Sequence, residues 1–202
     1  MVVSHTIHLI DDDEDVRKAL AFLLGTAGYA VKVYESATAF LQKLEGLQPG
    51  CIVSDVRMPG VDGLELQRRL KEKGIALPVV IMTGHADVPL AVQAMKLGAV
   101  DFIEKPFSDD VMLGAIEHAL AAIRPAENGG EIEKIRARLE ALSDRERQVL
   151  QGLLAGHPNK TIAYDLGLSP RTVEVHRANV MGKMAAGSLS ELVRMALLAG
   201  FS

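Results

Sequence analysis

Short apolar segments alternate with amphipathic segments along the first part of the chain. Five apolar runs stand out, at residues 6–10, 30–34, 51–54, 78–82 and 100–103. Their short length and nearly continuous apolar character are typical of strands that are buried on both faces of a sheet. Between the runs, apolar residues recur at helical spacing, as Val16, Leu20 and Leu23 do. This pattern predicts five repeats of strand and helix.

Such repeats are typical of a doubly wound α/β domain, in which helices cover both faces of a parallel sheet. Glycines suited to left-handed helix ends punctuate the helical segments at Gly28, Gly46, Gly74 and Gly98. We therefore predict a doubly wound α/β domain with a five-stranded parallel sheet over residues 1–124.

The composition changes at residues 125–130, where Pro, Asn and two Gly occur close together. A charged amphipathic helix with Ile135 and Leu139 follows, and no strand-like run occurs after it. We predict a partly helical linker over residues 125–141 and an all-helical domain over residues 142–202. Ser143 and Glu146 open that domain with the pattern of a capping box.

The helical part contains the pattern of a helix-turn-helix. A turn at Gly167-Leu168-Ser169 separates two short helical segments, with Ser169 as N-cap and Pro170 at the first helical position. In this motif the second helix enters the DNA major groove. The exposed face of the second helix is expected to carry Arg171, Thr172, Arg177 and Asn179, with Lys183 further along. Because arginine neutralises phosphates, and arginine and asparagine can also read base edges, we expect Arg171, Arg177 and Asn179 to contact DNA. A plain helical bundle with a charged solvent face is the alternative.

Composition excludes several classes of protein. A chain of 202 residues that is 49% hydrophobic is too apolar to be largely disordered. The single cysteine, Cys51, cannot form a disulfide framework and favours a reducing compartment. Because the sequence has neither a signal-peptide pattern nor a run of about 18 apolar residues, we expect a cytoplasmic protein with no membrane partner.

The net charge of −4 conceals a division along the chain. Residues 1–124 carry a net charge of −5, and residues 142–202 carry +2. Such asymmetry indicates different partners for the two parts, a cation or protein for the first and a polyanion for the second.

Polar side chains stand where the predicted strands end. Asp11 and Asp12 follow the first strand, Asp55 ends the third, and Thr83 and Lys105 follow the fourth and fifth. Ligands of open parallel sheets bind at this edge. Three carboxylates suit Mg²⁺, and an ammonium with a hydroxyl can hold phosphoryl oxygens. An aspartate beside the ion can attack phosphorus, so the combination predicts an aspartyl phosphate, although each residue alone is more often structural.

The chain closely resembles the receiver domain of bacterial two-component response regulators over about residues 4–124. The resemblance rests on Ile10-Asp11-Asp12, Asp55-Val56-Arg57-Met58-Pro59-Gly60-Val61-Asp62-Gly63, Met82-Thr83-Gly84-His85 and Lys105-Pro106-Phe107. It implies that Asp55 accepts a phosphoryl group from a sensor kinase. It also implies that Asp11, Asp12, Asp55 and the backbone carbonyl of Arg57 hold Mg²⁺.

The same resemblance assigns roles to residues around the phosphoryl group. It implies that Thr83 and Lys105 each bind a phosphoryl oxygen, and that Phe102 changes rotamer as Thr83 moves. An ordinary core role for Phe102 is an equally good interpretation. Lys105–Pro106 matches a peptide bond that is cis in the family.

Residues 142–202 resemble the four-helix DNA-binding domain of the NarL/FixJ subfamily, on the segments 159–163 and 172–176. The resemblance implies that Lys160 and Thr172 contact phosphates and that Glu174, Val175 and Ala178 face the bases. A lysine often stands where this chain has Glu174. Because a carboxylate repels phosphate but accepts from cytosine, we expect Glu174 to add selectivity rather than affinity.

Together the resemblances imply a phosphorylation-activated transcription factor. The expected partners are a FixL-like sensor histidine kinase, promoter DNA, RNA polymerase and, after phosphorylation, a second copy of the chain. Activation of nitrogen-fixation genes is the expected role, and regulation of another pathway is the alternative. We expect the protein to catalyse only its own phosphorylation and dephosphorylation.

Two other classes of protein are alternatives. An aspartate-nucleophile phosphohydrolase commonly needs a second aspartate two residues after the nucleophile, where this chain has Arg57. A regulator whose helical part binds polymerase or RNA would not need promoter DNA.

Overall fold

The computed structural model describes residues 5–84, 87–123 and 129–201. Residues 125–128 of the predicted linker and His85 of the third motif therefore lie outside the described residues. Contacts divide the chain into two compact units, one of residues 1–85 and 97–125 and the other of residues 86–96 and 126–202. Within the described ranges, no helix is long and apolar enough to cross a membrane.

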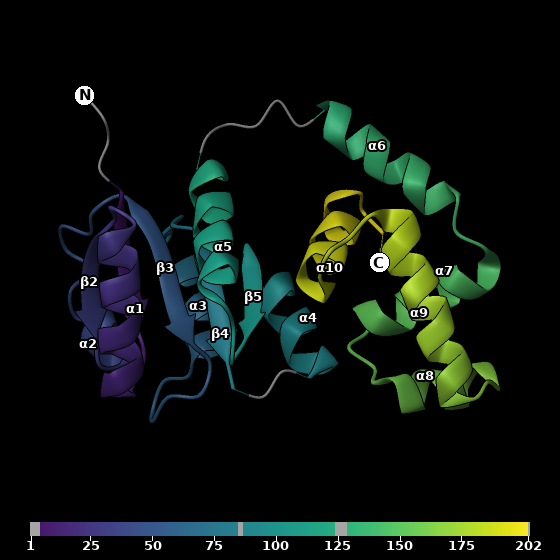
Figure 1. Cartoon of the computed structure of the whole chain (residues 1–202), viewed down its shortest axis with the longest axis horizontal. Coiled ribbons are helices and arrows are strands. Elements are labelled where there is room, and N and C mark those ends of the chain that lie inside the picture. The colour runs from purple at the N-terminus through teal and green to yellow at the C-terminus, as the bar shows by residue number, and fades with distance from the viewer. Residues whose placement is uncertain (1–4, 85–86, 124–128, 202) are drawn as a thin grey trace. The chain divides into compact units, whose positions relative to one another are not determined.

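The first unit follows the predicted alternation of strands and helices (Figure 1). Its elements are β1 (Thr6–Ile10), α1 (Glu14–Thr26), β2 (Ala30–Tyr34), α2 (Ala37–Leu41), β3 (Gly50–Asp55), α3 (Gly63–Glu72), β4 (Val79–Thr83), β5 (Asp101–Glu104) and α5 (Asp109–Ala121). Between β4 and β5 the chain forms α4 (Val88–Lys96), which the contacts group with the second unit.

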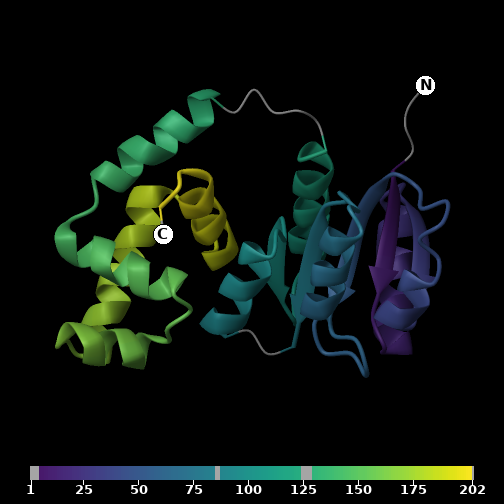
Figure 2. The ribbon, with the colours of Figure 1, turned by 180° about the vertical axis from the view of Figure 1, so that it is seen from behind.

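The five strands form one sheet in the order β2-β1-β3-β4-β5, and every neighbouring pair is parallel. Helices α1 and α5 lie on one face of the sheet and α2 and α3 on the other (Figures 1 and 2). The predicted five-stranded parallel sheet is thus confirmed. Because both faces are covered, the three inner strands β1, β3 and β4 are buried at every position, whereas the edge strands β2 and β5 are partly exposed.

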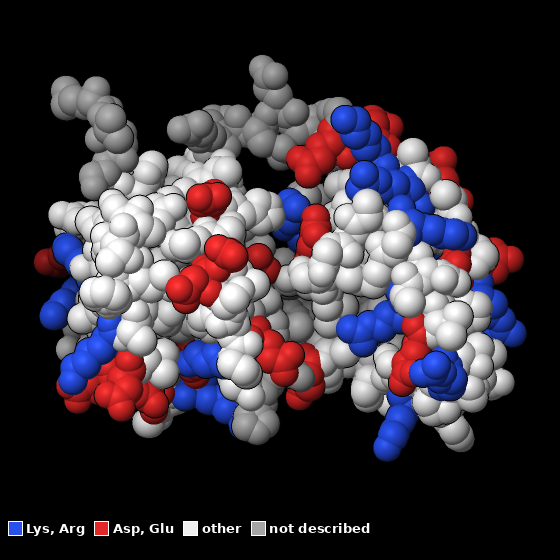
Figure 3. All heavy atoms as spheres, viewed as in Figure 1, with Lys and Arg blue, Asp and Glu red and all other residues white. Residues whose placement is uncertain are grey.

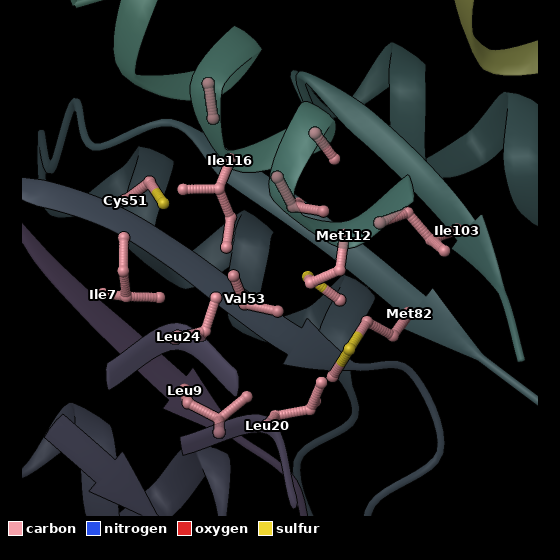
Figure 4. Packing of buried hydrophobic residues seen from close by; sticks show 13 residues of the cluster. Ile7, Leu9, Leu20, Leu24, Cys51, Val53, Met82, Ile103, Met112 and Ile116 are labelled. Carbon is pink, nitrogen blue, oxygen red and sulfur yellow. The ribbon is translucent and has the colours of Figure 1, made fainter. Parts of the chain in front are cut away.

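One hydrophobic cluster fills the space between the sheet and helices α1 and α5 (Figure 4). Its strand residues include Ile7, Leu9, Val53 and Met82, and its helix residues include Leu20, Leu24, Met112 and Ile116. Burying this many large apolar side chains is the main favourable term that holds the helices on the sheet. The carboxyl ends of β1, β3 and β4 are thereby fixed relative to one another.

The second unit is helical, as predicted. It contains α6 (Gly129–Glu140), α7 (Asp144–Leu154), α8 (Asn159–Leu166), α9 (Pro170–Met184) and α10 (Leu189–Leu198). Its buried core includes Ile135, Leu139, Val149, Leu150, Leu153, Ile162, Val173, Val180, Met184, Leu192 and Val193.

The turn between α8 and α9 has the helix-ending and helix-capping residues that the sequence predicted. Gly167 ends α8 in the left-handed conformation, with φ of 65°, which glycine adopts without steric cost. Ser169 then caps α9 by accepting from the backbone N–H of Thr172 at 3.1 Å, and Pro170 begins the helix. The two helices therefore meet in the geometry of a helix-turn-helix.

Glu146 is a buried carboxylate in the first turn of α7. Its Oε2 accepts from the Lys183 Nζ at 2.7 Å and from the backbone N–H of Ser143 at 2.8 Å, which completes the predicted capping box. The bond from Lys183, helped by the one from Ser143, lowers the pKa of Glu146 from 4.5 to about 2. The ionised carboxylate therefore stabilises the folded unit.

This lowered pKa predicts a loss of stability in acid. The contribution of Glu146 is present above about pH 4.5 and disappears as the pH falls toward 2, because the unfolded chain then binds the proton more tightly. Glu146→Gln should lower the stability of α7 and α9 at neutral pH by about 1–3 kcal/mol and flatten this acid dependence. Amide hydrogen exchange of the full chain at several pH values measures both effects. Exposed Glu140→Gln is the control, and an unchanged acid dependence in Glu146→Gln would contradict the assignment.

Candidate functional site

The ammonium of Lys105 bridges two carboxylates at the carboxyl edge of the sheet. Its Nζ donates to Asp11 Oδ2 at 2.7 Å and to Asp55 Oδ1 at 2.6 Å. Asp11 follows β1, Asp55 ends β3, and Lys105 follows β5. With only 1% of Asp11 and 6% of Asp55 exposed, both carboxylates depend on this cation for compensation of their charge.

The other oxygens of the two carboxylates are held by backbone groups. Asp11 Oδ1 accepts from the N–H of Asp13 at 2.9 Å, and Asp55 Oδ2 accepts from the N–H of Arg57 at 2.5 Å. Each carboxylate is thus fixed from both sides, by its own loop and by Lys105. The two groups are oriented before any ligand arrives.

Burial and charge shift the pKa values of this cluster. Burial raises the pKa of Asp11, and the bonds from Lys105 and Asp13 oppose the shift without cancelling it. Burial would lower the pKa of Lys105, but its bonds to Asp11 and Asp55 outweigh that effect and raise its pKa above that of an ordinary lysine. Lys105 is therefore charged at neutral pH. Acidic side chains also gather near the start of α1 (Figure 3), so the surroundings favour a further cation.

Oxygen atoms available here suit a hard cation. Within the described parts of the chain, no group of three or more His, Cys, Asp or Glu side chains is arranged to hold a metal ion. Mg²⁺, however, commonly uses only one or two carboxylates together with water and substrate phosphate. Asp11 and Asp55 provide two such carboxylates, and the Arg57 main chain lies beside them. The donor set fits Mg²⁺.

The remaining residues predicted for this site lie around the bridged pair. Thr83 is fully buried at the end of β4, and its carbonyl accepts from the N–H of Lys105 at 2.7 Å. Phe102 is half-buried in β5, paired in register with Ile81. Asp12 and the Arg57 side chain are exposed. The Lys105–Pro106 peptide is cis, as its resemblance to the family implied.

Two residues that position the site were not identified from the sequence as having these roles. The Arg17 Nη1 donates to the carbonyl of Asp11 at 2.8 Å. Its sequence signal is a cation in the acidic first turn of α1, where the helix dipole disfavours it. Gly63 lies against the β3 backbone, where a Cβ atom would stand 2.4 Å from the Asp55 carbonyl oxygen. Only glycine permits this approach.

Gly63→Ala should therefore disturb Asp55. The added methyl cannot fit without moving the backbone, and we expect a loss of about 1–3 kcal/mol in stability. Phosphorylation of the protein by acetyl phosphate should also slow. Urea unfolding and intact-mass spectrometry measure the two effects. Gly114→Ala in α5 is the control, because a Cβ there meets no atom within 4 Å and should be neutral or stabilising.

Helix α9 separates its buried face from its exposed face along its length. Val173, Val180 and Met184 point into the core. The exposed positions fall at spacings of three and four residues, which places them on one stripe. Five of them form what we call the exposed stripe: Arg171, Glu174, Val175, Ala178 and Asn179. Pro170, Gly182 and Lys183, nearer the helix ends, are also exposed. All five residues of the stripe were predicted to contact DNA, and the structure brings them together on one face.

Other predicted contacts lie beside this stripe. Lys160 is exposed on α8, while Thr172 and Arg177 are half-buried on α9. The Thr172 hydroxyl lies 2.8 Å from that of Ser169, and Arg171 pairs with Glu174 at 3.5 Å. Lys183 is exposed, as expected, and its ammonium is bound to Glu146 and to the Ala141 carbonyl.

Comparison with known proteins agrees with both units. The family described as "Response regulator receiver domain" matches residues 7–117. The family described as "Bacterial regulatory proteins, luxR family" matches residues 140–196. With the carboxylate cluster and the helix-turn-helix, these matches define a response regulator that joins a receiver to a DNA-binding domain.

More specific relatives cover almost the whole chain. The transcriptional regulatory protein FixJ of Rhizobium meliloti strain 1021 is 56% identical over 201 residues, covering 99% of this chain and 98% of the relative. FixJ of Bradyrhizobium diazoefficiens strain USDA 110 is 55% identical with the same coverage. A crystal structure of full-length FixJ from B. japonicum has a TM-score of 0.59 at 54% identity, covering 100% of both chains. The chain belongs to the FixJ-type transcriptional regulators.

Proposed function

We propose that this protein is a transcriptional activator that is switched on when Asp55 accepts a phosphoryl group. The observation that carries the proposal is the Lys105 ammonium held between Asp11 and Asp55. A half-buried cation between two buried carboxylates is a preorganised site for a small dianion that replaces part of the ion pairing.

Asp55 is the acceptor because its carboxylate ends the central strand β3, beside the N–H of Arg57 and the Lys105 ammonium. An oxygen of Asp55 attacks the phosphorus of the kinase phosphohistidine. The new P–O bond forms as the P–N bond breaks, and the imidazole leaves with its electron pair. Lys105 and Thr83 then bind phosphoryl oxygens, which places the transferred charge next to a fixed cation.

The metal-binding residues would be Asp11, Asp12, Asp55 and the carbonyl of Arg57. Mg²⁺, when bound, supplies charge that offsets the phosphoryl oxygens and the crowded carboxylates. This role requires Lys105 to share Asp11 and Asp55 rather than neutralise them alone. The side chain of Asp12, exposed next to Asp11, is available for such sharing.

Phosphorylation would shift an existing equilibrium rather than create a new fold. Thr83 lies at the end of β4 and is joined through its carbonyl to the backbone of Lys105. Movement of Thr83 toward the phosphoryl group would vacate space that half-buried Phe102 can occupy. The affected surface would then favour dimers, and two DNA-binding domains on paired half-sites bind more tightly than one.

Asp55→Asn should abolish phosphorylation, because the amide is not a nucleophile toward phosphorus. The full chain is incubated with acetyl phosphate and Mg²⁺, and intact-mass spectrometry detects the phosphoryl adduct. Asp62→Asn is the matched control, since Asp62 caps α3 by accepting from Glu65 at 2.7 Å and asparagine can do the same. Chelation of the metal should prevent labelling of both wild type and control. If Asp55→Asn were labelled to the same extent as wild type, the assignment of Asp55 as the acceptor would be refuted.

The second unit would read promoter DNA with α9. Glu174, Val175 and Ala178 are proposed to face base edges, and Arg171, Thr172, Arg177 and Asn179 to contact bases or phosphates together with Lys160. Val175 is 51% exposed although it is apolar, which suits contact with a thymine methyl group. The net charge of only +2 in this part of the chain makes a single copy a weak DNA binder.

Arg171→Ala should weaken DNA binding by about 1–3 kcal/mol. The probe is a 20-base-pair duplex (about two helical turns) selected from a randomised library by wild-type protein treated with acetyl phosphate. Fluorescence anisotropy at several salt concentrations gives the affinity and its salt dependence. Lys134→Ala removes the same charge from an exposed position on α6 and should bind like wild type. Equal losses in the two variants would show that only net charge matters.

The wider setting is proposed from the same resemblance. The receiver would occupy residues 1–124, the linker 125–141 and the DNA-binding domain 142–202. A FixL-like sensor histidine kinase would donate the phosphoryl group, RNA polymerase would be recruited, and the protein would act in the cytoplasm. The only catalysis would be transfer and hydrolysis of its own phosphoryl group.

Control of nitrogen-fixation genes is the favoured output, because the FixJ relatives reach 57% identity over 99% of the chain. A related regulator of another pathway is the alternative. The tetrathionate response regulatory protein TtrR of Salmonella typhimurium strain LT2 is 44% identical over 94% of this chain. Shared architecture therefore does not specify the regulated genes.

A further inference from the structure

Helix α6 and the recognition helix α9 cap each other's C-terminal ends. The Arg138 Nη1 of α6 donates to the carbonyl of Met184, the last residue of α9, at 2.9 Å. In return, the Lys183 Nζ of α9 donates to the carbonyl of Ala141, which directly follows α6, at 3.2 Å. The last carbonyls of a helix lack intrahelical partners and carry partial negative charge, so a cation is the favoured partner at each end.

Packing and a further ion pair also hold α6 and α9 together. Ile135 and Leu139 of α6 are buried, as is Met184 at the end of α9. Lys183 is also bound to Glu146 of α7, and the Arg147 Nη2 donates to the Leu139 carbonyl at 2.9 Å. Helices α6, α7 and α9 thus meet at one place, where cationic side chains bind the carbonyls at helix ends. We call this place the corner. None of these bonds involves the exposed stripe of α9.

The corner fixes the end of α9 that lies away from the turn at residues 167–169. The N-terminal end is fixed by the Ser169 cap and by α8. With both ends held, α9 has one orientation relative to the rest of the unit. Base readout depends on placing a few side chains to within a fraction of an ångström, whereas phosphate contacts tolerate more displacement.

We propose that α6 is a positioning element of the recognition helix, and that Arg138 and Lys183 are positioning residues for sequence-specific DNA binding. The inference rests on the proposed DNA-binding role of α9. It assigns a function to residues 129–141, which otherwise only connect two domains. Because α6 is the first helix after the segment that leaves the receiver, it is also the element through which that segment is attached to α9.

The test separates positioning from charge and from folding. Arg138→Met keeps an apolar stem that can pack but removes the donor, and Arg138→Lys restores a cation. Arg136→Ala is the matched control, because Arg136 is 55% exposed on the same helix and pairs only locally, with Glu133 at 3.0 Å. Full-length proteins treated with acetyl phosphate are titrated against the selected duplex and against a scrambled duplex of the same composition.

We expect Arg138→Met to lose about tenfold in affinity for the selected duplex and little for the scrambled one, since bidentate base contacts are each worth about that much. Its salt dependence should match wild type, because Arg138 touches no phosphate. Arg138→Lys should recover most of the loss, and Arg136→Ala should bind like wild type. Lys183→Met should lower the selected-to-scrambled ratio in the same way.

A wild-type ratio in Arg138→Met would overturn the inference. Equal losses on both duplexes would also overturn it, because they indicate a smaller folded fraction rather than a misplaced helix. Hydrogen exchange in the last turn of α9 supplies a readout without DNA, and it should quicken in Arg138→Met but not in Arg136→Ala. If wild type itself selects no duplex, the proposed DNA-binding function fails, whereas this exchange result still reports on the corner.

Discussion

The ion pair of Lys105 with Asp11 and Asp55 is the interaction on which the proposed function of the first unit depends. Two carboxylates that are almost completely buried lie at neighbouring strand ends, which is unfavourable unless a cation lies between them. The sheet order places β1 beside β3, and the lysine side chain reaches them from the end of β5, beyond β4. The apolar core under α1 and α5 holds these ends in place, so the energy of packing maintains the geometry of a polar site.

In the second unit, packing and helix capping fix the position of α9. Its helix α9 carries an apolar face inward and a mixed polar stripe outward. The Ser169 N-cap holds its first turn, and Arg138 of α6 holds its last residue. With a net charge of only +2 over residues 142–202, attraction to phosphate is modest. The orientation of the helix and the presence of a second copy then matter more than net charge, which is consistent with the proposed phosphorylation-dependent dimer and with the proposed positioning role of α6.

Much of this was predictable because each step used a local rule. Periodicity located the strands, and the strand ends located Asp11, Asp55, Thr83 and Lys105. Turn chemistry at Gly167 and Ser169 located the helix-turn-helix. The residues with unexpected roles were those whose partners lie far along the chain. Lys183 was predicted only to lie on the exposed face of α9, and its partners Glu146 and Ala141 come from α7 and from the end of α6.

The sequence by itself determined the two kinds of unit, the doubly wound sheet and the acids that end its strands, because hydrophobic period and strand-end chemistry are properties of neighbouring residues. Only the tertiary structure decided that one ammonium serves two carboxylates, that Gly63 must lie against the Asp55 carbonyl, and that α6 holds the end of α9. These are contacts between distant segments. The distances between these residues depend on how the sheet and the helices pack, so no local sequence pattern predicts them.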